Sequence, residues 1–399
     1  MSGAPPLAGI RVLDMASIIA APVAATLLGD FGAEVIKIEE PGRGDFMRRG
    51  AARPGGRTLA WVQDARNKES VTLDLRRPEG RDVLHRMLPL FDVVVTNFRP
   101  PTLDAWGLDP VGLVARYPRL IVLAISGYGQ TGPYRDRGAF DRIASAFAGL
   151  TYVSGEPDRP ATRSGFALID YMTAYMGAFG VVSALYHRDR AGGSGQVIDL
   201  ALFEPGFRAS EDALLAYAAR GTIRERSGNL NPAVVPAANF TTADGRDVAI
   251  HAGTDPLFRR LAGAMGQPDL PADPRFVNHH ARVANQAALY ARIATWVAGL
   301  ERDDVMAALT AASVPAAPVM NIADIAADPH YRARGTILPV RDAEFGELLM
   351  TGVLPKLSAT PGAVRSLGPE LGAGNLAFYR DRLGMTEAEL ARLREGGII

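Results

Sequence analysis

Short apolar segments alternate with helical segments through the first half of the chain, and this alternation limits the fold more than any other feature. Strands are predicted at 10–14, 34–39, 70–74, 92–96, 120–125 and 196–200. Helices are predicted between them at 20–31 and 78–88, and a longer helix runs from Asp170 to about His187. Short apolar strands separated by helices indicate an α/β fold, in which helices cover both faces of a parallel sheet. In such folds ligands bind at the carboxyl ends of the strands.

The second half has a different pattern, and we predict a second, smaller domain there. The 399 residues exceed what one hydrophobic core usually serves. A hairpin is predicted at 240–247 with the turn ADG, and helices follow near 255–265, 286–298 and 303–312. The expected order is a large domain at 1–205, a linker at 206–239, a small α+β domain at 240–325 and a C-terminal part at 326–399.

The charge composition argues against nucleic acid or a membrane as the main partner. Lys and Arg number 43, and Asp and Glu also number 43, so no net charge attracts a polyanion. A local cluster of arginines can still hold an anionic ligand. The longest apolar run, 171–186, is shorter than the ~20 residues that cross a bilayer and contains Thr173, so we predict a buried helix.

The chain contains no cysteine, which excludes disulfides, thiolate metal sites and cysteine nucleophiles. The start, MSGAPPLAG, lacks the basic and apolar segments of a signal peptide. Both features fit a cytoplasmic protein, and we expect that location.

Common catalytic motifs are missing, which leaves carboxylates as the leading nucleophile candidates. After the first predicted strand the chain reads SIIAAPVAA, without the glycines of a dinucleotide-binding loop. No G-x-S-x-G motif marks an acyl-transfer serine. The histidines at 279 and 280 lie in a polar segment that indicates a solvated loop, and we expect no metal site.

Asp170 is the one carboxylate at the head of a long apolar run, GFALIDYMTAYMGAFG. The residue can simply cap the helix that begins there, or it can act as a nucleophile. A helix N-terminus offers free N–H groups and the positive end of the helix dipole, and both favour the ionised form. Only the ionised form is nucleophilic.

Several ordered motifs favour the role of nucleophile, and we expect Asp170 to cap the helix as well. They are LAGIRVLDMASIIAAPVAATLLGDFGAEVIKIEEPGRGD, NKESVTLDLRRPEG, VVVTNFRPPTLDAWGLD, ISGYGQTGPYRDRGAFDRIASAFAGL, ALIDY, GSGQVIDLALFE and VPAAPVMNIADIAADPHYRARG. Together they resemble the class III CoA-transferase (CaiB/BaiF) family, which includes formyl-CoA transferases and carnitine CoA-transferase-like enzymes. The similarity covers nearly the whole chain, and the combined order is highly specific although each motif alone is weak.

The resemblance implies a homodimer of two interlocked rings. Each subunit would have a Rossmann-like large domain built from both termini, with the small domain between them. It also implies that a carboxylate attacks an acyl-CoA thioester to form a mixed anhydride. CoA thiolate then returns to give an enzyme–CoA thioester, and a second carboxylic acid takes the CoA. The matching carboxylate is Asp170, and CoA is a substrate rather than a permanent cofactor.

The resemblance also implies a set of CoA-binding positions, which follow the first, third and fourth predicted strands. They are Ile19, Ala20, Leu73, Asp74, Leu75, Arg76, Asn97, Phe98 and Arg99. Backbone groups and basic side chains suit a long, phosphate-bearing ligand. The two arginines can bind phosphate or carboxylate, or they can simply be solvated.

Three departures from the family pattern affect this site. Glu40 stands where formyl-CoA transferases have a basic residue that contacts CoA, and Ala105 stands where an arginine is common. The glycine-rich flap is also missing, and the nearest polar, flexible segment is 227–231. The details of phosphate binding and of water exclusion are therefore expected to differ.

The same family contains α-methylacyl-CoA racemases, and one position distinguishes the two activities. Racemases carry a general-base histidine directly before an aspartate, and Phe140 stands at that place here. Phenylalanine cannot accept a proton, so transfer is favoured over racemisation. Asp141 matches an acidic position near the catalytic carboxylate of formyl-CoA transferases, or it is a surface or helix-capping carboxylate.

Gln130 follows the fifth predicted strand in YGQ and is expected close to Asp170. Its side chain can orient the substrate or stabilise an oxyanion, or the glycines beside it only make the turn. We expect one of the two substrates to contain a dicarboxylate such as succinate, because CoA esters of dicarboxylic acids are common donors in the family. A CoA-binding protein without turnover is the remaining alternative, and the presence of Asp170 weakens it.

Overall fold

The structure is a computed structural model that describes residues 3–49, 57–231 and 233–399. The chain divides into two compact units. The first contains Met1–Thr151, Arg163–Gly221 and His330–Ile399, and the second contains Tyr152–Thr162 and Thr222–Pro329. Residues 206–239, predicted as a linker, contain a helix, α10 (Ala213–Arg220), because the run ALLAYAAR is helix-forming although none of its side chains is buried.

A six-stranded sheet forms the centre of the first unit. Its strands are β1 (Arg11–Asp14), β2 (Glu34–Glu39), β3 (Lys68–Thr72), β4 (Val93–Thr96), β5 (Ile121–Ser126) and β6 (Val197–Ala201). All neighbouring strands are parallel, and their order is β3-β2-β1-β4-β5-β6. The predicted α/β class with a parallel sheet is confirmed. The strand order reverses between β1 and β4, which is where doubly wound folds bind ligands.

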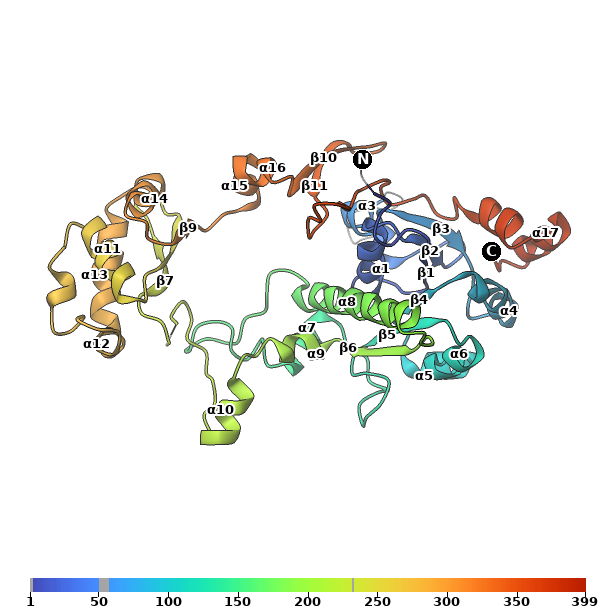
Figure 1. The fold of residues 1–399 in the computed structure, drawn as a ribbon, viewed down its shortest axis with the longest axis horizontal. Coiled ribbons are helices and arrows are strands. Elements are labelled where there is room, and N and C mark those ends of the chain that lie inside the picture. The colour runs from blue at the N-terminus through green and yellow to red at the C-terminus, as the bar shows by residue number, and fades with distance from the viewer. Residues whose placement is uncertain (1–2, 50–56, 232) are drawn as a thin grey trace. The chain divides into compact units, whose positions relative to one another are not determined.

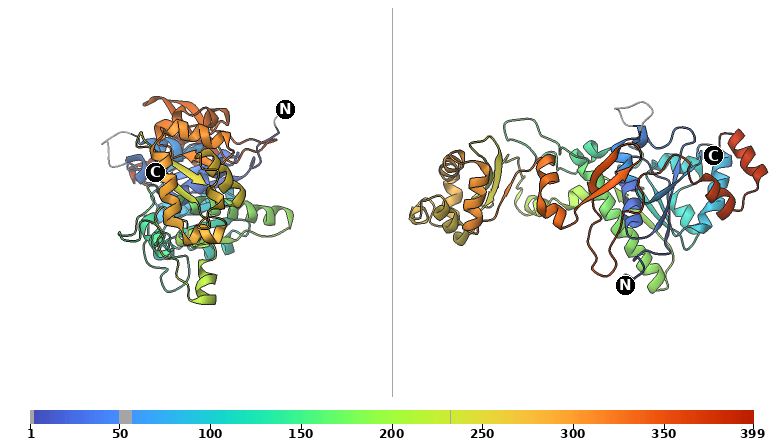
Figure 2. Two further views of the ribbon diagram at one scale, coloured as in Figure 1. Left: turned by 90° about the vertical axis from the view of Figure 1, so that its left-hand side faces the viewer. Right: turned by 90° about the horizontal axis from the view of Figure 1, so that it is seen from above.

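Helices cover both faces of this sheet, as Figures 1 and 2 show. The helices α1 (Ala20–Asp30) and α8 (Leu168–Arg190) pack on one face with Val12 and Leu123. The opposite face carries α4 (Pro78–Met87) and α17 (Glu387–Glu395), which pack with Leu13 and Val122. Successive strand residues thus point to opposite cores, as the period of two in a strand requires. Since both faces are buried, the strands are almost continuously apolar.

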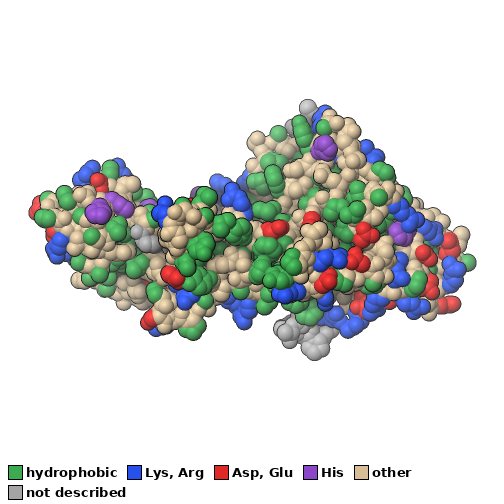
Figure 3. All heavy atoms as spheres, turned by 90° about the horizontal axis from the view of Figure 1, so that it is seen from below, with side chains coloured by type: hydrophobic (Ala, Val, Ile, Leu, Met, Phe, Trp, Pro, Cys, Tyr) green, Lys and Arg blue, Asp and Glu red, His purple; other side chains and the backbone are tan. Residues whose placement is uncertain are grey.

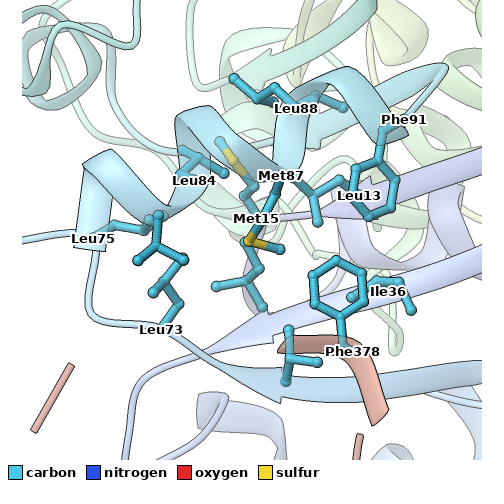
Figure 4. Packing of buried hydrophobic residues seen from close by; sticks show 14 of the residues in the cluster. Leu13, Met15, Ile36, Leu73, Leu75, Leu84, Met87, Leu88, Phe91 and Phe378 are labelled. Carbon is cyan, nitrogen blue, oxygen red and sulfur yellow. The ribbon is translucent and has the colours of Figure 1, made fainter. Parts of the chain in front are cut away.

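The C-terminal segment belongs to the same core as the first strands. Phe378 lies in a π-helical segment (Ala377–Arg382) and packs beside Ile36, with Phe91 nearby (Figure 4). The ring centroids of Phe91 and Phe378 are 6.0 Å apart. The backbone N–H of Asp74 donates to the carbonyl of Ile398 at 2.8 Å. The last residues therefore close the large unit beside the loop that follows β3.

Several predicted element boundaries agree with the structure, whereas the predicted start of β3 does not. β2 and α13 (Gln286–Ala298) have the predicted limits. Strand β3 begins two residues earlier than predicted, at Lys68, because this lysine is buried and bonded to Asp14 at 2.8 Å. A charged residue in a buried strand does not match an apolar pattern, although its partner makes the position stable.

Helix α8 is the one helix of the described residues that is long and apolar enough to cross a membrane, judged by length and composition alone. Its residues Ile169, Ala174 and Val181 are buried in the core that it shares with α1. Its other side exposes Tyr175 and Phe179, among other apolar side chains. The structure uses α8 as a core helix of the first unit.

The second unit has its own sheet and core. The hairpin of β7 (Ala237–Thr241) and β8 (Asp247–His251) pairs with β9 (Ala316–Pro318), and the predicted hairpin is confirmed. Its helices are α11 (Asp255–Ala264), α12 (His279–Ala284), α13, α14 (Arg302–Ala311) and α15 (Ile322–Ala327).

The remaining elements are short. They are α2 (Phe46–Arg49), α3 (Leu59–Asp64), α5 (Pro100–Trp106), α6 (Pro110–Arg116), α7 (Asp141–Phe147), α9 (Phe203–Arg208), α16 (Pro329–Ala333), β10 (Ile337–Asp342) and β11 (Gly346–Thr351). On the face of the molecule in Figure 3, basic and acidic side chains are interspersed and apolar side chains lie between them.

Candidate active site

A cavity of about 440 Å³ lies at the carboxyl ends of the central strands. Residues that follow β1, β4 and β5 line it, together with the first turn of α8. Its lining includes Ser17, Ile18, Ile19, Ala20, Asn97, Phe98, Arg99, Ser126, Arg137, Phe140, Asp170 and Leu202. The cavity therefore occupies the switch point of the sheet, where a ligand is expected.

A second cavity of about 280 Å³ continues the first across the ends of β2 and β3. Ser17 and Phe98 line both cavities, so the two spaces adjoin. The residues predicted to bind CoA divide between them. The cavity that contains Asp170 is lined by Ile19, Ala20, Asn97 and Arg99. The second cavity is lined by Leu73, Asp74, Leu75 and Arg76. Phe98 lines both cavities. A trough of this form suits a long ligand whose reactive end lies at Asp170.

Asp170 is a buried carboxylate without a partner. Its residue is 9% exposed, and within the described part of the chain no donor or cation bonds to its side chain. Burial and the nearby charge of Asp141 raise the pKa of Asp170 from 3.8 to about 7. Both causes disfavour the charged form. This shift is opposite in direction to the sequence-based expectation that the helix end favours the ionised form of Asp170.

The group that caps α8 is Asp141, which lies at the start of α7. Its Oδ1 accepts the backbone N–H of Ile169 at 2.8 Å and that of Asp170 at 3.4 Å. The helix begins at Leu168, after Ala167, so Asp170 lies inside the first turn and its side chain caps nothing. The prediction that Asp170 is the cap is wrong because a carboxylate from a distant part of the chain occupies the free N–H groups. Asp141 caps α8 and also lies near enough to Asp170 to raise the pKa of that carboxyl, and a catalytic role for Asp141 stays a prediction.

The loop after β1 is held in a strained conformation at the cavity. Ile18 has a φ of 71°, which is unfavourable for a β-branched residue. The Asn97 side chain accepts from the N–H of Ser17 at 2.9 Å and donates to the Ser17 carbonyl at 2.7 Å. Asp45 accepts from the N–H of Ile18 at 3.3 Å. The contact of Asn97 with CoA stays a prediction, but its amide already positions this loop.

A buried ionic network lies behind the same loop. Lys37 Nζ is 3.1 Å from Asp45 and 3.7 Å from Asp14, and it also donates to the Ala16 carbonyl. Lys68 Nζ is 2.8 Å from Asp14. This network was not predicted from the sequence, although charged residues inside apolar strands are a signal for it. The network fixes the backbone from which the cavity wall is built.

Arg76 is engaged by acidic residues in the second cavity. Its guanidinium lies 2.8 Å from Asp74 and 2.9 Å from Glu40. Glu40, the departure noted in the sequence, therefore neutralises a predicted phosphate-binding group. The arginines of the first cavity differ, because Arg99 donates to the backbone carbonyl of Asp136 and Arg137 stacks on the ring of Tyr134 at 3.8 Å. Neither has an acidic partner within the described residues.

Gln130 is not brought into the cavity of Asp170. Its N–H donates to Asp199 at 2.9 Å, and its carbonyl accepts from Arg135 at 3.0 Å. Its side-chain Nε2 is buried and unbonded among the described residues. Gln130 is absent from the lining of this cavity as described, so its role at Asp170 stays a prediction. Across residues 3–49, 57–231 and 233–399, no group of three metal-ligating side chains is found.

Comparison with known proteins identifies the class to which this fold and site belong. The model of CoA-transferase family III matches residues 7–375, and the chain belongs to this family. It is an enzyme that transfers CoA, and CoA thioesters are its substrates. Racemisation, the alternative left open by the sequence, is not favoured.

The chain is 45% identical to a succinyl-CoA–D-citramalate CoA-transferase of Chloroflexus aurantiacus, over 99% of this chain and 98% of the relative. It is 34% identical to a succinate–glutarate CoA-transferase of Agrobacterium fabrum, over 92% and 93%. The crystal structure of a CAIB/BAIF family protein from Brucella suis superimposes with a TM-score of 0.84 at 34% identity and covers 96% of this chain and 100% of that one.

Proposed function

We propose that the enzyme transfers CoA from succinyl-CoA to a short dicarboxylic acid through a covalent intermediate on Asp170. The observation that carries this proposal is the buried, unpartnered carboxylate of Asp170 at the end of a two-part trough. The donor and the acceptor class are supported by the relatives, two of which are named for succinyl-CoA with citramalate or malate and one for succinate with glutarate.

The reaction would proceed by acyl exchange on one carboxylate. Asp170 attacks the thioester carbonyl carbon, the carbon–sulfur bond breaks, and CoA leaves as thiolate while a mixed anhydride forms. The thiolate then attacks the carbonyl carbon of Asp170, releasing succinate and leaving an enzyme–CoA thioester. The acceptor carboxylate attacks this thioester and again expels CoA thiolate. Attack of the thiolate on the acceptor's acyl carbon gives the new thioester and restores Asp170, with no net proton change.

The cavity environment suits both parts of this cycle. An unpartnered carboxylate held by burial is a better nucleophile than one bonded to donors, once it is ionised. Arg99 and Arg137 place positive charge at the wall of the same cavity, where a second carboxylate of the substrate can bind. Arginine is well suited to that task because its planar guanidinium matches a carboxylate.

A panel of acceptor acids tests the proposed substrates. Purified enzyme is incubated with succinyl-CoA and either glutarate, malate or citramalate, or with the monocarboxylates butyrate and valerate, and the CoA esters are separated by chromatography. We expect dicarboxylates to be esterified at least ~10-fold faster, about 1.4 kcal/mol of discrimination. Equal rates with butyrate or valerate would contradict the dicarboxylate assignment.

We also propose that the enzyme is a homodimer, with the interlocked arrangement that the family resemblance implies. An apolar cavity of about 480 Å³ lies along α1 and the exposed side of α8, lined by Leu27, Tyr175 and Phe179. Exposed apolar surface of this kind marks protein contacts. Light scattering should give close to twice the chain mass of 42.5 kDa, and a monomeric mass would refute the dimer. The cytoplasmic location stays a prediction.

Asp141→Asn is expected to move the pH dependence of transfer toward lower pH. The charge of Asp141 is one cause of the raised pKa of Asp170, whereas asparagine keeps the oxygen that caps α8. Loss of the neighbouring charge stabilises ionised Asp170, so the apparent pKa of the acid limb of kcat/KM should fall below about 7. This apparent pKa should stay above 3.8, because Asp170 is still buried.

The measurement is kcat/KM for succinyl-CoA between about pH 5 and pH 9. Asp109→Asn is a matched control, because Asp109 caps α6 by accepting the N–H of Gly112 at 2.7 Å and does not line the cavity of Asp170. An acid limb that stays in place in Asp141→Asn would show that Asp141 does not influence the ionisation of Asp170.

A further inference from the structure

Ser126 occupies a defined position at the wall of the cavity that contains Asp170. It is the last residue of β5 and pairs with Ala201 of β6. Its backbone carbonyl accepts a hydrogen bond from the N–H of Leu202 at 2.9 Å. Its residue is 6% exposed. The backbone of Ser126 is therefore fixed by the sheet, and its side chain is enclosed.

The hydroxyl of Ser126 has no hydrogen-bond partner among the described residues, although it is closed to bulk water. Other hydroxyls of the first unit are bonded. Thr173 donates to the carbonyl of Ile169 at 2.8 Å, and the hydroxyls of Ser145 and Thr151 are 3.0 Å apart. Buried polar groups are nearly always bonded, and an unbonded one lowers the stability of the folded chain. The exception at Ser126 lies at the reacting end of the trough.

We propose that Ser126 is a catalytic residue whose hydroxyl turns about χ1 toward the cavity and donates a hydrogen bond to the acyl oxygen when Asp170 attacks the thioester. This inference rests on the proposed function. Attack converts the carbonyl into a tetrahedral centre, and negative charge develops on its oxygen until the carbon–sulfur bond breaks. A hydrogen-bond donor in a site closed to bulk water is effective at that moment, because little water competes for the oxyanion.

The rest of the cavity wall supports this role. Ile18, Ile19 and Leu202 are apolar, and the amide of Asn97 is already bonded to Ser17. The cations Arg99 and Arg137 are exposed at the wall, where they are suited to a distal carboxylate. Ser126 supplies a buried neutral donor that can stabilise an oxyanion. A neutral donor forms no ion pair with Asp170, so the nucleophilicity of the carboxylate is retained.

The test compares Ser126→Ala, Ser126→Thr and Ser145→Ala in the full-length enzyme, with succinyl-CoA and the best acceptor of the panel. Ser126→Ala should lower kcat by about 100-fold with little change in the KM for succinyl-CoA. Its Tm should be equal or higher, because an unbonded hydroxyl is removed. Ser126→Thr, which keeps the hydroxyl, should retain most of the activity. Ser145→Ala removes a bonded buried hydroxyl and should lower the Tm while leaving kcat unchanged.

The possible outcomes separate this role from a structural one. Full kcat in Ser126→Ala would overturn the proposal. A lower kcat together with a lower Tm would also overturn it, because a structural hydroxyl gives that combination. If the native enzyme does not transfer CoA from succinyl-CoA, the proposed function fails and the role of Ser126 fails with it. If the native enzyme is active and Ser126→Ala retains full turnover, the role of Ser126 is refuted while the proposed function stands.

Discussion

Asp170→Asn is expected to lower the rate of CoA transfer by a factor on the order of 1,000 or more. Asparagine has the size of aspartate but is neutral at every pH, so it cannot attack a thioester. The carboxylate lies in the cavity at the strand ends, and among the described residues it has no partner that asparagine would lose. The assay is transfer from succinyl-CoA, followed through the CoA ester of the acceptor. A variant with more than a tenth of native activity would exclude Asp170 as nucleophile.

The stability of the same variant provides an independent readout. Folded Asp170 keeps its proton up to about pH 7, whereas in the unfolded chain it ionises near 3.8. The contribution of Asp170 to the stability of the native protein therefore falls as the pH rises from about 4 to about 7, and asparagine does not ionise. The Tm of Asp170→Asn should rise relative to native over this window and stay higher above it. Asp303→Asn, at an exposed carboxylate of α14, should show neither effect.

Arg282→Met is expected to destabilise the second unit by about 3 kcal/mol or more. The side chain is 0% exposed and donates to the carbonyls of Val235 at 3.0 Å, Gly253 at 2.9 Å and Phe276 at 3.4 Å. It also pairs with Asp255 at 2.8 Å. Methionine has a similar length but no donors, so three buried carbonyls lose their hydrogen bond, at about 1 kcal/mol or more each.

Denaturant unfolding measures this effect through fluorescence, because Trp296 lies in the second unit. Arg275→Met is the matched control, since Arg275 is on the surface and its guanidinium pairs with Asp273 at 2.6 Å. Its midpoint should stay close to native. An Arg282→Met midpoint equal to that of Arg275→Met would show that the buried contacts of Arg282 do not stabilise this unit.

The layered fold could be predicted because its signals are local. Apolar strands such as β2 and the long apolar run of α8 follow from periodicity and composition. The short helices α5 and α6 were missed because each is only seven residues long and begins with proline, which also marks turns. The early start of β3 at Lys68 depends on Asp14, far away in the chain, and no local pattern reports such a pair.

The candidate site was predictable in position but not in its hydrogen bonding. Loops at the ends of parallel strands must meet at one edge of the sheet, so the predicted residues at 19–20, 73–76 and 97–99 line one trough. Which side chains bond to each other depends on distant partners. The cap of α8 comes from Asp141, Arg76 is bonded to Glu40, and the hydroxyl of Ser126 has no partner in the part of the chain that the structure describes. The sequence alone shows the residue types at these positions but not these pairings.

The central claim is that Asp170 carries CoA covalently during transfer, and trapping tests it most directly. Enzyme and succinyl-CoA are incubated without acceptor, treated with borohydride, digested and analysed by mass spectrometry. Borohydride reduces an aspartyl thioester to the alcohol, so residue 170 should appear as homoserine, with one oxygen fewer and two hydrogens more. The change should require succinyl-CoA and be absent in Asp170→Asn. An active enzyme with residue 170 unmodified, or with another carboxylate reduced instead, would contradict the account.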